Sequence, residues 1–259
     1  MQRSRLIPVL LLDARRRLVK TEGFERRTYV GDPFNVIRLF NEKEVDEICL
    51  LDIDASPQGR APDVGYLREL ASECFMPLAY GGGITRMQEC DALLRVGVEK
   101  FVLGRAASDS ALIGEMVGRL GSQAVVACVD VRGDGQDAHC RHPDGTRQDP
   151  ASVCTSLADL GVGEIILQSI DRDGSRRGYD LPLLRRISSC VSIPVIALGG
   201  AGQLDDLLDG IDAGASAAAS GSAFVFLGRL RAVLVTYPHA HAIAASREAR
   251  SGRAPDSSG

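Results

Sequence analysis

The second half of the chain repeats the first half at a spacing of 117 residues. Three pairs of segments carry the repeat: 47–54 (EICLLDID) with 164–171 (EIILQSID), 76–83 (MPLAYGGG) with 193–200 (IPVIALGG), and 97–105 with 214–222. Such a duplication predicts two similar halves related by a pseudo-two-fold axis, so that a binding feature at one end of the fold should occur twice.

Short runs rich in Val, Ile and Leu alternate with segments of helical hydrophobic spacing. The runs predict strands at 6–12, 47–54, 76–83, 100–107, 124–131, 164–171, 193–200 and 215–223. The intervening segments predict helices at 33–44, 64–74, 87–96, 110–120, 151–160, 181–190 and 204–213. Eight such units match a closed (β/α)8 TIM barrel built from two half-barrels, a single domain at 1–245. An open doubly wound sheet is the alternative, but the first strand is followed by Asp13-Ala-Arg-Arg-Arg17 and not by a glycine fingerprint.

Charge and composition exclude several classes of protein. With 30 Lys and Arg against 34 Asp and Glu, the net charge of −4 provides no general attraction for nucleic acid or an anionic membrane. The longest apolar run, Leu6–Leu12, is too short to span a bilayer or to form a secretory signal, so we expect a soluble, cytoplasmic protein. Seven cysteines, mostly within apolar stretches, indicate reduced thiols. The tail 246–259 has almost no apolar residues and is expected to be disordered.

Glycines and one carboxylate mark the predicted carboxyl ends of the strands, where barrels of this kind place their sites. Glycine turns at 81–83, 104, 199–202 and 221 occur in both halves and predict two phosphate clamps, with tight turns alone as the alternative. Asp130 closes an apolar strand, so desolvation should suit it for proton transfer, although a helix cap or an ion pair is the simpler alternative. The histidines have no metal-site spacing, and we expect neither metal nor cofactor.

Together these segments resemble the cyclase subunit of imidazole glycerol phosphate synthase, from about residue 5 to residue 237. The motifs that carry the resemblance are Ile7-Pro8, Asn41-Glu42, Leu51-Asp52-Ile53, Gly81-Gly-Gly-Ile84, Gly121-Ser-Gln123, Asp171-Arg-Asp-Gly174, Gly178-Tyr-Asp180 and Gly199-Gly-Ala-Gly202. The family is a (β/α)8 barrel that receives ammonia from a separate glutaminase subunit and uses it on a bisphosphate intermediate of histidine biosynthesis. The resemblance therefore implies a phosphorylated substrate and a glutaminase partner at the amino-terminal face of the barrel.

Family roles transfer to matching positions of this chain. The resemblance implies that Asp130 is the second catalytic aspartate and Lys20 the lysine of the mobile first loop. It assigns the phosphate clamps to Gly82, Gly83 and Gly104 in one half, and to Asp173, Gly174, Gly200, Gly221 and Ser222 in the other. The family's ammonia gate falls on Arg5, Glu47, Lys100 and Glu164, with a salt-bridge layer that closes the barrel floor as the structural alternative.

Three positions depart from the family pattern. Leu11 stands where the family has its first catalytic aspartate, and Asp13, two residues on, is the available substitute although it should lie about 6–7 Å further along the strand. Gly104-Arg105 replaces an Asn-Ser/Thr pair and adds a cation to the first clamp. Leu198 replaces a serine of the second clamp.

These departures favour a paralogue with a different substrate. The chain also resembles a branch of the family, and that resemblance implies that the barrel and its glutaminase supply ammonia to a third, ATP-using enzyme that makes an acetamidino sugar of surface polysaccharide. The motifs Ile7-Pro-Val-Leu-Leu11, Asn41-Glu-Lys-Glu-Val-Asp-Glu47 and Met76-Pro-Leu-Ala-Tyr-Gly-Gly-Gly83 look closer to that branch. Two alternatives stay open: the histidine-pathway cyclase itself, and a non-catalytic ammonia conduit that activates its glutaminase.

Overall fold

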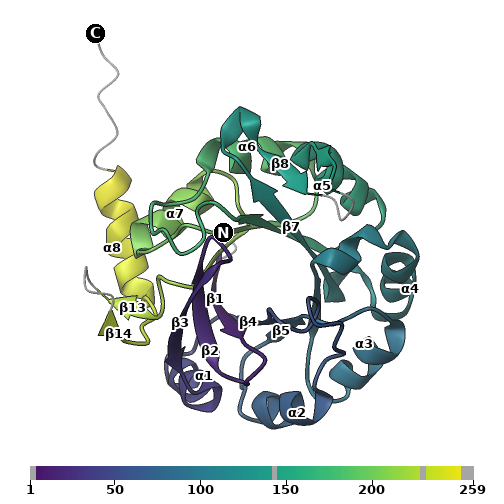
Figure 1. The fold of residues 1–259 in the computed structure, drawn as a ribbon. Coiled ribbons are helices and arrows are strands. Elements are labelled where there is room, and N and C mark those ends of the chain that lie inside the picture. The colour runs from purple at the N-terminus through teal and green to yellow at the C-terminus, as the bar shows by residue number, and fades with distance from the viewer. Residues whose placement is uncertain (1–3, 142–144, 228–231, 252–259) are drawn as a thin grey trace.

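A closed ring of parallel strands forms the centre of the molecule (Figure 1). The computed structural model describes residues 4–141, 145–227 and 232–251, and within them eight strands form the barrel. These are β1 (Arg5–Leu12), β4 (Ile48–Asp52), β5 (Leu78–Gly81), β6 (Lys100–Leu103), β7 (Val125–Arg132), β10 (Glu164–Ser169), β11 (Val195–Leu198) and β12 (Ala217–Ser220). The predicted TIM barrel is confirmed.

The strand order shows the two halves of the repeat. Strands β1, β4, β5 and β6 follow one another around the ring, then β7, β10, β11 and β12, and parallel pairing of β12 with β1 and of β7 with β10 closes it. In the register, Leu11 lies beside Leu51 in the first half, and Asp130 lies beside Gln168 in the second.

Seven helices surround the barrel in the part of the chain that the structure describes, each close to its predicted range. They are α1 (Pro33–Glu42), α2 (Val64–Ser72), α3 (Met87–Leu94), α4 (Ser110–Leu120), α5 (Pro150–Asp159), α6 (Leu181–Cys190) and α7 (Leu204–Asp212). An aspartate side chain caps the amino end of five of them, accepting backbone N–H groups of the first turn: Asp32, Asp63, Asp109, Asp149 and Asp180. These caps satisfy N–H groups that a helix leaves free, and they set where each helix begins.

The apolar side chains form two layers. Residues on the outer face of the strands pack against the helices, whereas alternate residues such as Ile7, Val9, Cys49, Val126 and Ile166 fill the barrel interior. Strands buried on both faces have to be apolar throughout, which accounts for the continuous hydrophobic runs in the sequence.

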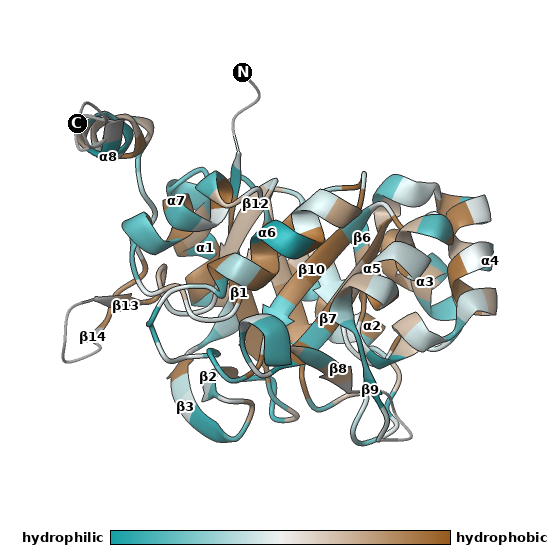
Figure 2. Ribbon diagram, turned by 90° about the horizontal axis from the view of Figure 1, so that it is seen from above, coloured by the Kyte–Doolittle hydropathy of each residue, from teal (hydrophilic) through white to brown (hydrophobic). Residues whose placement is uncertain are grey.

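Further elements extend from the two ends of the barrel (Figure 2). The hairpins β2 (Leu18–Glu22) with β3 (Arg26–Gly31), and β8 (His139–Arg141) with β9 (Arg147–Gln148), lie at the carboxyl ends of the strands, which we call the mouth. Strands β13 (Phe226–Leu227) and β14 (Ala232–Val233) form a separate pair. No helix among the described ranges is long and apolar enough to cross a membrane.

The C-terminal helix α8 (Ala240–Ser251) differs from the expected disorder of the tail from residue 246 onwards. Arg250 forms ion pairs with Asp209 and Asp212 of α7, and Ser246 Oγ donates to Asp205 Oδ1. These polar contacts and the packing of the partly buried Ile243 against the core hold the helix, and the polar composition of the tail did not predict it. Residues 252–259 of the expected tail lie outside the described residues.

Candidate active site

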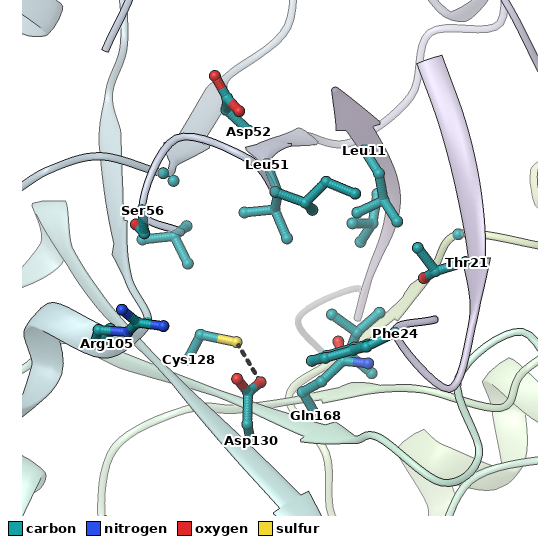
Figure 3. A pocket seen from close by; sticks show the side chains of 18 of the residues that line it. Leu11, Thr21, Phe24, Leu51, Asp52, Ser56, Arg105, Cys128, Asp130 and Gln168 are labelled. Atoms are coloured by element: carbon teal, nitrogen blue, oxygen red, sulfur yellow. Dashed lines mark hydrogen bonds between the residues drawn. The ribbon is translucent and has the colours of Figure 1, made fainter. Parts of the chain in front are cut away.

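A cavity of about 420 Å³ lies at the mouth and gathers residues from both halves of the barrel (Figure 3). Most of the predicted site residues line it, namely Lys20, Gly82, Gly83, Gly104, Arg105, Asp130, Asp173, Gly221 and Ser222. Gln168, Cys128, Phe24, Ser56 and Leu51 also line it and were not predicted. The repeat could have predicted two of these lining residues, because it aligns Leu51 with Gln168 at the same position of their strands.

Asp130 projects from β7 into the cavity, where the carboxylate is accessible from the mouth yet enclosed by protein on most sides. Enclosure raises the pKa of Asp130 to about 6, because desolvation disfavours the ionised form. Cys128 Sγ donates to Asp130 Oδ1 at 3.7 Å and opposes this rise, whereas the negative charge of Asp173 adds to it. A carboxyl group with such a pKa can both donate and accept a proton near neutral pH.

The opposite wall of the cavity is apolar. Figure 3 shows Leu11 and Leu51 together, across the cavity from Asp130 and Cys128. Because Leu51 is the repeat counterpart of Gln168, the strand register makes Leu11 the counterpart of Asp130. The barrel therefore has a leucine where its own symmetry would place a second carboxylate facing Asp130.

Asp13 does not supply that second carboxylate. It follows the last residue of β1, is absent from the cavity lining, and accepts two hydrogen bonds from the Arg17 guanidinium and two from the backbone N–H groups of Arg15 and Arg17. These bonds outweigh partial desolvation and lower the pKa of Asp13. The residue stabilises a turn outside the mouth cavity.

Other strand-end carboxylates are also bound by neighbours. Asp54 forms a bidentate pair with Arg27, at 2.7 and 2.8 Å, and its pKa is lowered chiefly by this contact. Asp52 accepts the backbone N–H groups of Asp54 and Ala55 and lies 3.2 Å from Arg60 Nη2. Among these acids, Asp130 is the one that we select for proton transfer.

The β2–β3 hairpin brings Lys20 to the cavity. Thr21 Oγ1 donates to Asp173 Oδ2 and Gly23 N donates to Asp173 O, which holds the hairpin against the loop after β10. Lys20 is 5% exposed, and its Nζ donates to Val9 O. Desolvation lowers the pKa of Lys20 to about 7, although Asp173 opposes the shift.

The predicted clamp glycines fall into two groups. A Cβ atom at Gly82 would lie 2.4 Å from Asp52 O, and one at Gly83 would lie 2.3 Å from Arg60 O, so both turns require glycine at positive φ. Gly104 has open space around it, and the adjacent Arg105 reaches the cavity. Gly174 and Gly200 are absent from the cavity lining and instead allow close backbone contacts, with Thr21 O and Gly178 O respectively.

Four charged side chains form a closed ring at the amino ends of the strands, which we call the floor ring. Arg5 contacts Glu47 and Glu164, each at 2.6 Å. Lys100 contacts the same two carboxylates at 2.8 and 3.1 Å. The four residues of the predicted gate therefore alternate in charge around one opening.

Between the floor ring and the mouth lies an apolar interior. A small space of about 10 Å³, room for roughly one water-sized molecule, is lined by Glu47 and Glu164 and by apolar residues of the strands such as Ile7, Val102 and Ile196. Above the two carboxylates the lining is apolar and offers little to hold a charged species, so a small neutral molecule would meet the lowest desolvation cost there.

The fold and these two ends define the chain as a duplicated (β/α)8 barrel of enzyme type, with its candidate site at the mouth. Comparison with known proteins gives the family. Residues 5–230 match the family model described as histidine biosynthesis protein. The chain belongs to this family, within the HisF-type cyclase subunits of imidazole glycerol phosphate synthase.

Three relatives illustrate the similarity. A Pseudomonas aeruginosa protein, provisionally named imidazole glycerol phosphate synthase subunit hisF2, is 48% identical over 92% of this chain and 97% of its own. A Vibrio vulnificus protein, provisionally named subunit hisF3, is 42% identical over 92% and 94%. The imidazole glycerol phosphate synthase subunit HisF of Hyphomonas neptunium is 38% identical over 87% and 91%.

Proposed function

We propose that the chain is the ammonia-accepting subunit of a glutamine amidotransferase, and that its mouth serves an acceptor other than the histidine-pathway intermediate. The observation that carries this proposal is Leu11 facing Asp130, because a leucine cannot transfer a proton where a cyclase of this family uses a carboxylate. Asp130 would act as the general acid and base, and the glycine turns with Arg105 would bind a phosphate group.

The floor ring and the apolar interior support delivery of ammonia through the barrel. In this proposal a glutaminase subunit, the HisH type of the family, docks on the amino-terminal face and releases ammonia below the ring. Glu99 and Gln123 are exposed near this face and are our proposed contacts. Opening of one ion pair would admit neutral ammonia to the interior.

The acceptor class that we propose is a sugar destined for surface polysaccharide, amidated with the help of a third, ATP-using enzyme. The change at Leu11 and the added cation at Arg105 support a different acceptor, and the relatives named hisF2 and hisF3 indicate that variants of the subunit occur.

Incubation of the purified chain with the histidine-pathway bisphosphate intermediate and a high ammonium concentration tests the proposal. We expect turnover at least about 10²-fold below that of an ordinary cyclase, the typical contribution of one acid–base group. Turnover at the ordinary rate would refute the altered acceptor and identify the chain as the histidine-pathway cyclase.

The variant Asp130→Asn separates a catalyst from a conduit. An enzyme that uses Asp130 should lose on the order of 10²-fold in synthase activity, whereas a pure conduit should be unaffected. Stimulation of the glutaminase partner should survive in both cases, because Asp130 lies at the mouth and the partner would dock at the floor.

A further inference from the structure

Lysine is rare in this chain. Of its 30 cationic side chains only three are lysines, Lys20, Lys43 and Lys100, and the other 27 are arginines. Lys100 belongs to the floor ring and Lys20 lines the mouth cavity, while Lys43 follows α1 at its carboxyl end. An arginine keeps its proton at any physiological pH, but a buried lysine can lose it and become a nucleophilic amine.

The surroundings of Lys20 suit a free amine better than a permanent ion pair. Its Nζ donates to a backbone carbonyl oxygen, that of Val9, while the nearby Asp173 carboxylate accepts from Thr21. The charge of Asp173 favours the protonated form, but desolvation outweighs it and brings the pKa of Lys20 to about 7. A substantial fraction of this amine is therefore uncharged at neutral pH.

The amine also lies beside the second clamp. A Cβ atom placed on Gly221 would be 3.0 Å from Lys20 Nζ, and Gly221 and Ser222 line the same cavity. Asp130, whose carboxyl group can exchange protons near neutral pH, lines this cavity as well, together with the cations Arg27 and Arg105. The mouth cavity therefore holds a nucleophilic amine on Lys20, a group on Asp130 that can carry a proton, and side chains that can bind an anion.

We propose that Lys20 Nζ forms a reversible imine with the carbonyl carbon of a phosphorylated aldehyde or ketone, such as an open-chain sugar phosphate, held in the mouth cavity. The nitrogen lone pair attacks the carbonyl carbon and a C–N bond forms. The C–O bond then breaks, and the oxygen leaves as water with the two amine hydrogens, so that the step needs no oxidant or reductant. The proposal is independent of ammonia delivery and of the glutaminase partner.

Pyridoxal 5′-phosphate is a suitable probe because it carries both an aldehyde and a phosphate. The full-length protein is incubated with it at pH 7, the imine is reduced with borohydride, and modified peptides are mapped by mass spectrometry. With three lysines and the N-terminus as the only amines of this kind, one map covers every site. We expect at least about tenfold more adduct at Lys20 than at Lys43, and less with pyridoxal, which lacks the phosphate.

Two substitutions distinguish an imine from simple charge pairing. Lys20→Arg keeps a cation for a phosphate but should abolish the adduct and the absorbance of the bound imine. Lys43→Met should change neither. Inorganic phosphate should compete with labelling of Lys20 and leave Lys43 unaffected. Equal labelling of Lys20, Lys43 and the N-terminus, or probe binding by wild type and Lys20→Arg alike without an adduct at Lys20, would overturn the proposal.

Discussion

Replacement of Glu47 by glutamine tests whether the floor ring stabilises the barrel. Glu47 Oε2 accepts from Arg5 at 2.6 Å and from Lys100 at 2.8 Å, and its side chain is only 5% exposed. Hydrogen bonds to charged groups contribute about 1.5–3 kcal/mol each, so their complete loss would cost about 3–6 kcal/mol. Glu164 still contacts both cations, and a glutamine oxygen can still accept one bond. We therefore expect a net loss of about 2 kcal/mol.

Calorimetry should show this loss as a fall in Tm of about 4–8 °C for a domain of this size. Glu69→Gln, on the exposed face of α2, is the matched control and should stay within about 0.5 kcal/mol of wild type. A double-mutant cycle with Lys100→Met should give a coupling energy of about 1 kcal/mol or more. If Glu47→Gln has the same Tm as the control variant, the floor ring does not stabilise the fold and our account of it is wrong.

Three further predictions concern the mouth. Folding raises the pKa of Asp130 from 3.8 to about 6, so the folded state loses stability as the pH rises through this range. In urea unfolding at pH 7.5, Asp130→Asn should therefore raise the free energy of unfolding by about 1 kcal/mol, after allowance for solvent in the cavity. At pH 4 the substitution should leave this free energy unchanged. Leu11→Asp should raise turnover of the histidine-pathway intermediate at least about tenfold in a steady-state assay, and an unchanged rate would show that other differences exclude that substrate. Gly83 has φ +73°, and a Cβ atom there would lie 2.3 Å from Arg60 O, so Gly83→Ala should lower the free energy of unfolding in urea by about 2 kcal/mol or more. Gly104→Ala, with open space around it, should lower it by less than about 0.5 kcal/mol. Equal losses would contradict the steric argument.

The barrel could be predicted because local pattern and tertiary position agree. The apolar runs are buried on both faces, and five of the seven surrounding helices begin at an aspartate cap such as Asp32 or Asp180, so sequence signals and packing coincide. The floor ring was predicted from the family resemblance, which assigned its four residues by position, and their places at the amino ends of the strands bring them together.

The remaining differences arise where local spacing gives no information about tertiary contacts. Asp13 has the right spacing to face the mouth, but β1 ends at Leu12 and the Arg17 guanidinium draws the carboxylate away. The hairpin that carries Lys20 depends on Asp173, more than 150 residues distant in the chain. Helix α8 is held by ion pairs to α7, which composition alone does not reveal.

The division of the floor charges between the halves bears on how such a barrel could be assembled from separate pieces. In the floor ring, the N-terminal half carries one surplus positive charge, from Arg5, Glu47 and Lys100. The C-terminal half carries the matching negative charge, from Glu164. Two copies of the same half would place like charges together in the floor ring and repel each other. One copy of each half would pair the opposite charges. If the gene were cut between α4 and β7, co-expressed fragments should therefore associate as a mixed pair in preference to self-paired homodimers.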